Sequence, residues 1–380
     1  MKKNIPLCIP NLTGNESKYL QNCIETTFVS SVGEYVNSFE EMLKKNTGYK
    51  YACAVSSGTT ALHLSLDAVG AKHDELVIVP TYSFIASANA VTHTGASPFF
   101  VDIDKETLNV DLDNLDSILE DKFILKEQGL FHIESKKRLA AIMPVFCIGQ
   151  PISFKKINEF QEKWNIPMVI DAAGAIGCES ENKKIGHIKN GFSTISFNGN
   201  KTFTCGGGGA LLTNDEKLFK LASHKSKTAR PSEEYIHDMV GFNFRMTNIQ
   251  AALGVAQLER FEEFISKKIE IFNFYKQNIQ LENIKFINLK DTKSSRWLSF
   301  FLIQDSSSIS PEYIFKTLNK MNVESKPFWV PLHLQPPYKS CLKELDGTAE
   351  KIYKQIIVLP SSTNLTLKDQ SYVVEMINKL

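Results

Sequence analysis

Short hydrophobic runs rich in β-branched residues recur through the first two thirds of the chain and predict strands. They are Tyr51–Val55, Leu76–Val79, Leu139–Val145, Met168–Ile170, Thr194–Phe197 and Ala210–Thr213. Between several of them, apolar residues repeat at spacings of three and four, the period of a helix with one buried face. These helical segments are Thr60–Val69, Ser83–Thr94 and Ile152–Trp164. The alternation favours an α/β fold with a mainly parallel central sheet covered by helices, in which ligands bind at the carboxyl ends of the strands.

The last third has a different pattern. A long periodic stretch predicts a single helix over Asn248–Ile279 that carries the chain out of the sheet. Beyond it, strand-like Trp297–Ile303 and Ile356–Leu359 alternate with helix-like Pro311–Met321 and Leu367–Leu380, which is typical of a compact α+β unit.

This change of pattern predicts two domains. A chain of 380 residues is long enough for two hydrophobic cores. We expect a large domain over residues 1–260 and a small C-terminal α+β domain over residues 261–380, with the N-terminal segment placed to pack on the small domain.

Composition and charge narrow the classes of partner. Lys plus Arg total 43 against 42 Asp plus Glu, so the chain has no excess positive charge to attract nucleic acid. Pro6, Pro10 and Asn11 interrupt any apolar export signal, and no apolar run approaches the roughly 20 residues needed to span a membrane. The seven scattered cysteines favour a reducing cytoplasm, and neither they nor the eight histidines have metal-ligand spacing, so no metal is expected.

The segment SSGTTAL (56–62) follows a predicted strand and opens a predicted helix. It therefore places free backbone N–H groups and hydroxyls at the positive end of a helix, where an anion such as a phosphate binds. The alternative is that Thr59 or Thr60 serves only as the helix N-cap.

Asp171 and Lys201 are two further candidate site residues, because of the segments in which they lie. Asp171 ends the apolar run MVID, so its carboxylate lies at the sheet edge, either paired with a cation such as a protonated pyridine nitrogen or capping the following turn. Lys201 closes SFNGNK after a strand and precedes Gly206–Gly209. Most lysines are solvated surface residues, but a desolvated lysine with a lowered pKa, approached closely by glycine backbone, is the residue type that forms Schiff bases.

These segments occur in the chain order of fold-type I pyridoxal-phosphate enzymes, and the sequence resembles the DegT/StrS-type sugar aminotransferases along nearly its whole length. The matching motifs are SSGTTALHLSL (56–66), VPTYSFIASANAV (79–91), IDAAGAIG (170–177), SFNGNK (196–201), GGGGALLT (206–213) and GFNFRMTNIQAALG (241–254).

The resemblance implies roles for the matching residues. Lys201 would hold pyridoxal 5'-phosphate as a Schiff base and move protons, Asp171 would pair with the pyridine nitrogen, and Phe84 would stack on the ring. The phosphate would be held by Gly58, Thr59, Thr60 and Ser196.

Further residues concern the substrate and a second subunit. Asn243 would reach the phosphate of the neighbouring subunit, which implies a homodimer with shared active sites. Arg245 and His333 would contact substrate. The chain departs from the family at Gly174, where His or Gln usually approaches the phenolic oxygen of the cofactor. Loss of that contact would shift the pKa of the Schiff base or leave space for a substrate group.

Further motifs resemble the branch that serves legionaminic-acid and bacillosamine-type pathways. They are FVSSVGEYVNSFE (28–40), PLHLQPPY (331–338) and VLPSSTNLT (358–366). This branch implies amino transfer from L-glutamate to carbon 4 of a nucleotide-linked 4-keto-6-deoxy-N-acetylhexosamine, for surface-glycan sugars. Alternatives are another keto-sugar acceptor, such as an octulosonate derivative, or a non-catalytic regulatory homologue. Related dehydratases carry histidine in place of the Schiff-base lysine, and Lys201 argues against that class.

Overall fold

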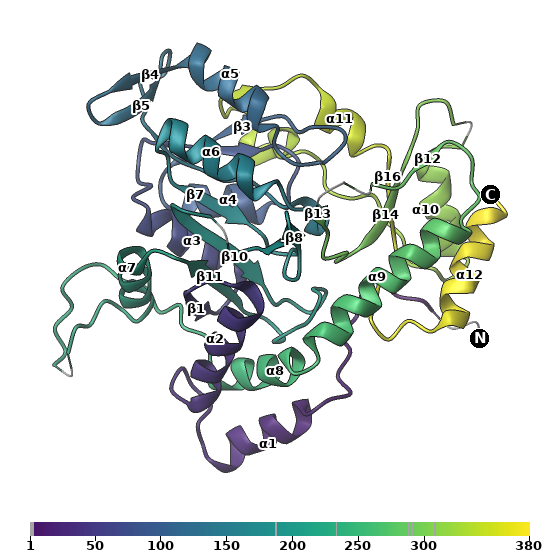
Figure 1. Ribbon diagram of the computed structural model, residues 1–380, viewed down its shortest axis with the longest axis horizontal. Helices are drawn as coiled ribbons and strands as arrows, with labels where there is room; N and C mark the ends of the chain where they lie inside the picture. The colour runs from purple at the N-terminus through teal and green to yellow at the C-terminus, as the bar shows by residue number, and fades with distance from the viewer. Residues whose placement is uncertain (1–3, 187, 233, 288, 290–291, 308) are drawn as a thin grey trace.

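The computed structural model describes residues 4–380 except 187, 233, 288, 290–291 and 308. An eight-stranded sheet lies at its centre (Figure 1). Its strands run in the order β1 (Tyr51–Val55), β11 (Gly209–Thr213), β10 (Gly191–Ser196), β7 (Met168–Asp171), β6 (Leu139–Ile142), β2 (Leu76–Pro80), β3 (Ser97–Val101) and β15 (Lys343–Glu344). Only β11 is antiparallel to its neighbours in this sheet, so the predicted α/β fold with a mainly parallel sheet is confirmed.

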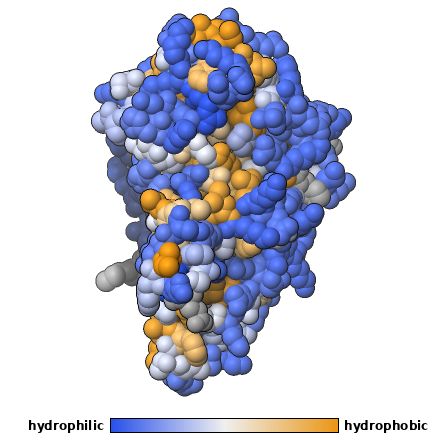
Figure 2. Space-filling view, turned by 90° about the vertical axis from the view of Figure 1, so that its left-hand side faces the viewer, coloured by the Kyte–Doolittle hydropathy of each residue, from blue (hydrophilic) through white to orange (hydrophobic). Residues whose placement is uncertain are grey.

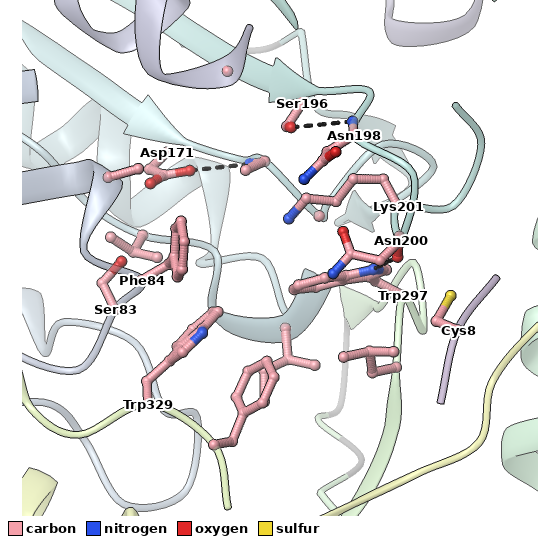
Figure 3. A pocket seen from close by; sticks show the side chains of 18 of the residues that line it. Cys8, Ser83, Phe84, Asp171, Ser196, Asn198, Asn200, Lys201, Trp297 and Trp329 are labelled. Carbon is pink, nitrogen blue, oxygen red and sulfur yellow. Dashed lines mark hydrogen bonds between the residues drawn. The ribbon is translucent and has the colours of Figure 1, made fainter. Parts of the chain in front are cut away.

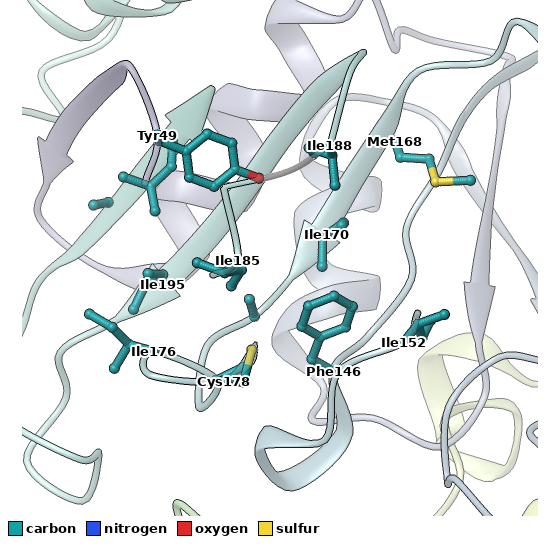
Figure 4. Packing of buried hydrophobic residues seen from close by; sticks show 14 of the residues in the cluster. Tyr49, Phe146, Ile152, Met168, Ile170, Ile176, Cys178, Ile185, Ile188 and Ile195 are labelled. Atoms are coloured by element: carbon teal, nitrogen blue, oxygen red, sulfur yellow. The ribbon is translucent and has the colours of Figure 1, made fainter. Parts of the chain in front are cut away.

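Helices cover the sheet and complete its core. They are α2 (Glu34–Thr47), α3 (Gly58–Ala68), α4 (Ala86–His93), α5 (Leu112–Lys122), α6 (Phe154–Trp164) and α7 (Glu216–Ser226). A short hairpin of β4 (Phe123–Lys126) and β5 (Gly129–His132) follows α5. Figure 4 shows Phe146, Ile170 and Ile195 in the largest cluster of buried side chains. Burial of both faces explains why the central strands have continuous apolar runs rather than alternation.

The C-terminal third forms a second, smaller sheet. It consists of β12 (Ile284–Lys285), β14 (Ser299–Ile303) and β16 (Ile356–Leu359). The helices of this third are α9 (Phe261–Asn278), α10 (Pro311–Lys320), α11 (Thr348–Ile352) and α12 (Leu367–Asn378). Other short strands in the described residues are β8 (Glu179–Ser180), β9 (Lys183–Lys184) and β13 (Thr292–Lys293), which pair with one another. Three 3-10 turns occupy Cys147–Gly149, Leu332–Leu334 and Pro336–Tyr338.

Segments from both ends of the chain cross to the other sheet. The N-terminal segment pairs with the small sheet's side of the molecule, since Ile5 bridges to Val323 and the backbone N–H of Ser361 donates to the carbonyl of Leu7 at 2.7 Å. Conversely, β15 of the C-terminal third forms one edge of the large sheet. A division into domains at residue 260 stays a prediction.

The predicted single helix over Asn248–Ile279 is wrong. The chain forms α8 (Asn248–Leu258), which packs on α1 (Glu16–Glu25) and α2, and then turns into α9 (Figure 1). At the turn, Arg260 donates to Glu263 at 2.7 Å and to Thr13 at 2.8 Å. Both helices bury one face, so the apolar period continues through the bend and gives no sign of it. No helix of the described residues is long and apolar enough to cross a membrane.

Candidate active site

A cavity of about 630 Å³ opens where the carboxyl ends of β7 and β10 face residues of the C-terminal third. The predicted site residues that line it are Gly58, Thr59, Phe84, Asp171, Ser196 and Lys201. The sheet edge brings together side chains that lie as much as 143 positions apart in the sequence, from Gly58 to Lys201. Figure 3 shows the Lys201 amine pointing into the space between Asp171, Phe84 and Trp297.

The amino end of α3 forms one wall of the cavity. Its N-cap is Ser57, whose hydroxyl oxygen accepts from the backbone N–H of Thr60 at 3.1 Å, while the Thr60 hydroxyl oxygen accepts from the backbone N–H of Ser57 at 2.9 Å. The alternative that Thr59 or Thr60 is the N-cap is therefore wrong. Thr59 lines the cavity, whereas the Thr60 hydroxyl is used within the capping box.

Glycines let three backbone segments approach one another at this wall. A Cβ on Gly58 would lie 2.8 Å from the Cβ of Ser196, and one on Gly209 would lie 2.5 Å from the carbonyl carbon of Ser57. Gly207 and Gly208 line the cavity beside them. This wall of the cavity therefore consists of small residues at the positive end of a helix, where a phosphate group can bind.

Asp171 is 5% exposed and held by two donors. The Ser87 hydroxyl donates to its Oδ2 at 2.6 Å, and the backbone N–H of Ala173 donates to its Oδ1 at 3.1 Å. Ser83 and Ser87 are joined through their hydroxyls at 2.7 Å. Asp171 thus caps the following turn and lines the cavity at the same time, and its partner Ser87 was not among the predicted site residues. The spacing of Ser83 and Ser87, one helical turn apart in a motif of the family, was the available signal.

Lys201 enters the cavity from the turn after β10. Burial lowers the pKa of its amine to about 8, an effect that the nearby Asp171 carboxylate and Cys8 thiol only partly oppose. The Lys201 Nζ lies 3.6 Å from the ring centroid of Trp297. An amine with this pKa is partly neutral near neutral pH, so it can act as a nucleophile and exchange protons.

Aromatic side chains of the C-terminal third close the cavity, and no motif of the sequence marked them. The Trp329 ring lies 6.4 Å from Phe84 and 4.2 Å from Phe328, measured between centroids. Phe84 itself is 55% exposed toward the opening. The space beside Gly174 is filled by Trp297, so it is not available to a substrate group.

Besides Thr60, three predicted residues lie outside this cavity. The Arg245 guanidinium forms an ion pair with Glu40 at 2.6 Å and also contacts Cys53. Burial lowers the pKa of Arg245, but Cys53 and Glu40 together raise the pKa by more. His333 is buried, with its Nδ1 2.6 Å from the Thr81 hydroxyl and its Nε2 3.2 Å from Glu350. Asn243 is exposed on the surface. Their roles in binding substrate or a neighbouring subunit stay predictions.

Comparison with known proteins identifies the family. The model of the DegT/DnrJ/EryC1/StrS aminotransferase family matches residues 10–378. The chain belongs to this family. It is 35% identical over 378 residues to a GDP-perosamine synthase of Escherichia coli O157:H7, with 99% of this chain and 98% of the relative covered.

One further relative agrees with this assignment, and a solved structure shares the fold. A UDP-4-amino-4,6-dideoxy-N-acetyl-beta-L-altrosamine transaminase of Campylobacter jejuni is 32% identical, covering 90% of this chain and 88% of the relative. The solved structure of Helicobacter pylori PseC, an aminotransferase involved in pseudaminic acid biosynthesis, matches the fold with a TM-score of 0.88 at 24% identity, covering 99% of each chain.

The chain is therefore a sugar aminotransferase, and its cofactor is pyridoxal phosphate. The cavity fits this cofactor on its own geometry. The wall at the amino end of α3 can hold the phosphate, the buried Asp171 carboxylate can pair with a protonated ring nitrogen, and Lys201 provides an amine with a pKa of about 8. Among the described residues, no cluster of three or more His, Cys, Asp or Glu side chains could hold a metal ion.

Proposed function

We propose that this sugar aminotransferase moves the amino group of L-glutamate to carbon 4 of a nucleotide-linked 4-keto-6-deoxy-N-acetylhexosamine, in the synthesis of a surface-glycan sugar. The observation that carries the proposal is the meeting of Lys201, Asp171 and the α3 amino end in one cavity. The N-acetyl sugar is supported by the name of the Campylobacter relative and by the motifs at residues 28–40, 331–338 and 358–366.

A second candidate acceptor is a GDP-linked keto-sugar. It is favoured by the 35% identity to a GDP-perosamine synthase, which extends over 99% of this chain. The two candidates share the reaction and differ in the nucleotide and in the N-acetyl group, so the same assay distinguishes them.

When bound, pyridoxal phosphate would supply the electron-withdrawing ring needed for amino transfer between the two substrates. The protein's residues direct this chemistry. The Asp171 carboxylate, fixed by Ser87 and Ala173, stabilises positive charge on the ring nitrogen. Lys201 accepts and returns protons, because its pKa of about 8 lies near the working pH. Trp297 and Trp329 exclude water from the space around the amine.

We also propose that two chains form a homodimer with shared active sites. Residues 227–232 and 234–243 lie in an arm that projects beside α7 (Figure 1), and its apolar side chains are unusually exposed: Tyr235 is 87%, Ile236 60% and Val240 84% exposed. Figure 2 shows this side of the molecule, with hydrophobic side chains at the surface among hydrophilic ones. Large exposed apolar groups mark interaction surfaces. Asn243 stands exposed at the base of the arm, where it could reach a second chain.

We expect the reaction to take place in the cytoplasm. All seven cysteines are free thiols, as in proteins of a reducing compartment.

The proposal is tested by incubating the purified protein with L-glutamate and a panel of nucleotide-linked keto-sugars, followed by mass spectrometry. The expected product is the amino sugar of a UDP-linked N-acetylhexosamine, formed together with 2-oxoglutarate. Lys201→Ala is the control without catalysis. Product from a GDP-linked sugar alone would favour the second candidate, and no product from any sugar would contradict both.

A further inference from the structure

Gly174 and the indole of Trp297 are in close contact. A Cβ built on Gly174 would lie 2.5 Å from Cε3 and 2.8 Å from Cδ2 of the indole, distances that real Cβ atoms do not show. The φ of Gly174 lies outside the left-handed region that favours glycine. Glycine is therefore required here because of space and not because of backbone conformation, and the space is taken by one named side chain.

Hydrogen bonds hold the indole at this place. Its Nε1–H donates to the carbonyl of Asn200, immediately before Lys201, at 2.6 Å. The backbone carbonyl of Trp297 accepts from Lys268 at 2.9 Å, and the neighbouring Ser295 hydroxyl donates to the carbonyl of Gly174 at 2.7 Å. Trp297 is 4% exposed. These contacts tie the turn that carries Lys201 to the C-terminal third.

The face of the same indole lies against the Lys201 amine, with Nζ 3.6 Å from the ring centroid (Figure 3). Two effects compete there. The ring face attracts a charged amine, while exclusion of water favours the neutral form. Among the titratable groups that act on the amine, Asp171 at the end of β7 and Cys8 of the N-terminal segment favour its charged form. The pKa of Lys201 is nevertheless lowered, so exclusion of water outweighs the effect of these two groups.

We propose that Trp297 is a positioning residue for Lys201, and that Gly174 is the small residue that admits its indole to the edge of the cofactor cavity. One edge of the indole anchors the backbone before Lys201, and its face sets where the free amine rests and keeps water from it. A larger side chain at position 174 and an indole at position 297 exclude each other. The proposal rests on the function proposed above only in that Lys201 is the reactive amine.

The pairing is tested by a double-mutant cycle on the melting temperature of the full chain. Gly174→Ala is expected to lower the melting temperature, because the added methyl group overlaps the indole. In a Trp297→Ala background, the same Gly174→Ala change is expected to lose at least half of its effect, because the overlap is gone. Additive effects of the two substitutions would overturn the pairing.

Positioning is tested by acetylating the full chain, freed of cofactor, across a range of pH and measuring modification of Lys201 by mass spectrometry. The midpoint is expected near pH 8 in the wild type. In Trp297→Ala it moves up by about one unit, because water reaches the amine. Trp164→Phe is the matched control, since the Trp164 indole donates to Asp116 at 2.7 Å and does not line the cavity. An unchanged midpoint in Trp297→Ala, or an equal shift in the control, would overturn the role.

Trp297→Phe keeps an aromatic ring beside the amine but loses the N–H and the area of the second ring. If Trp297→Ala does not fold, this variant carries the test. We expect its acetylation midpoint to stay near that of the wild type while kcat falls about tenfold with KM within about twofold, because the tie to Asn200 is lost. A wild-type kcat would contradict the proposal. Acetylation and melting need no sugar substrate, so a chain that aminates no sugar would refute the proposed function and leave these two tests intact.

Discussion

At the scale of single residues, Asp171 combines two tasks that the sequence presented as alternatives. Its carboxylate accepts hydrogen bonds from Ser87 and from the backbone of Ala173, and it faces the cofactor cavity. Both donors need an acceptor, so the carboxylate is already fixed before any ligand binds.

Asp171→Asn is expected to lower kcat/KM at least about 100-fold, because a neutral amide cannot stabilise a cationic ring nitrogen. It should also lower stability by about 1–3 kcal/mol, since the amide has one acceptor for two donors. Steady-state kinetics and a melting curve measure the two effects. Ser87→Ala keeps the carboxylate and should lose less activity. Turnover of Asp171→Asn equal to that of the wild type would refute the assignment.

The lowered pKa of Lys201 links stability to pH. Its amine has a pKa of about 8 in the folded chain against an ordinary value of 10.5. The unfolded chain therefore binds this proton more tightly, so the lysine destabilises the fold below pH 8 and the penalty disappears as the pH rises to 10.5. In the cofactor-free chain, Lys201→Met should melt higher than the wild type at pH 7, by a margin that shrinks over this window.

The control for that measurement is Lys155→Met, since Lys155 is a surface residue with a side chain 76% exposed. Its difference from the wild type should not change with pH in the same way. A margin for Lys201→Met that is constant from pH 7 to pH 10.5 would show that burial does not shift this amine.

At the scale of elements, α3 is where a capping motif and a binding site occupy the same turn. Ser57 and Thr60 satisfy each other's backbone N–H groups, while Ser57, Gly58 and Thr59 line the cavity. The sequence SSGTT does not show which residues cap the helix and which line the cavity, since each hydroxyl is suited to either role.

Gly58→Ala is expected to weaken pyridoxal-phosphate binding at least about tenfold, because its Cβ would lie 2.8 Å from Ser196 at the phosphate wall. Gly199→Ala is the matched control: it lies in the turn before Lys201, and its Cβ would meet no atom within 4 Å. Cofactor titration followed by absorbance measures both. Equal affinities of the two variants would place the phosphate elsewhere.

At the scale of the whole molecule, the homodimer prediction depends on Asn243. If this side chain serves the site of the neighbouring subunit, Asn243→Ala and Lys201→Ala chains, each inactive alone, should complement when mixed. One site of the hybrid then carries both defects and the other carries neither, so about half of the wild-type activity per dimer should return.

Exchange of subunits must be demonstrated before the activities are compared, for instance with two differently tagged chains, because an interface burying more than about 2,000 Å² exchanges slowly. If hybrids form and remain inactive, Asn243 does not act across the interface. A wild-type mixture of tagged chains controls for losses during exchange.

Local sequence patterns predicted six of the eight strands of the large sheet and the reactive groups, but they did not predict helices α1, α2, α5, α7 and α11. Strands β1 and β16 have the predicted bounds, because a buried strand needs a local run of apolar residues whatever surrounds it. Strand β3 was missed, since Ser97 and Pro98 begin it and proline is unusual in a strand. Lys201 and Asp171 could be singled out because their chemistry is carried in short motifs that directly follow strands.

The surroundings of those groups depend on tertiary contacts that local patterns do not specify. Trp297 lies 96 positions after Lys201 in the sequence, and its indole meets both Lys201 and Gly174 only because the C-terminal third folds back over the sheet edge. The bend between α8 and α9, which leads the chain back, leaves the apolar period unbroken. Local patterns record which face of an element is buried, but they do not record its direction or its partner, and the walls of this cavity depend on both.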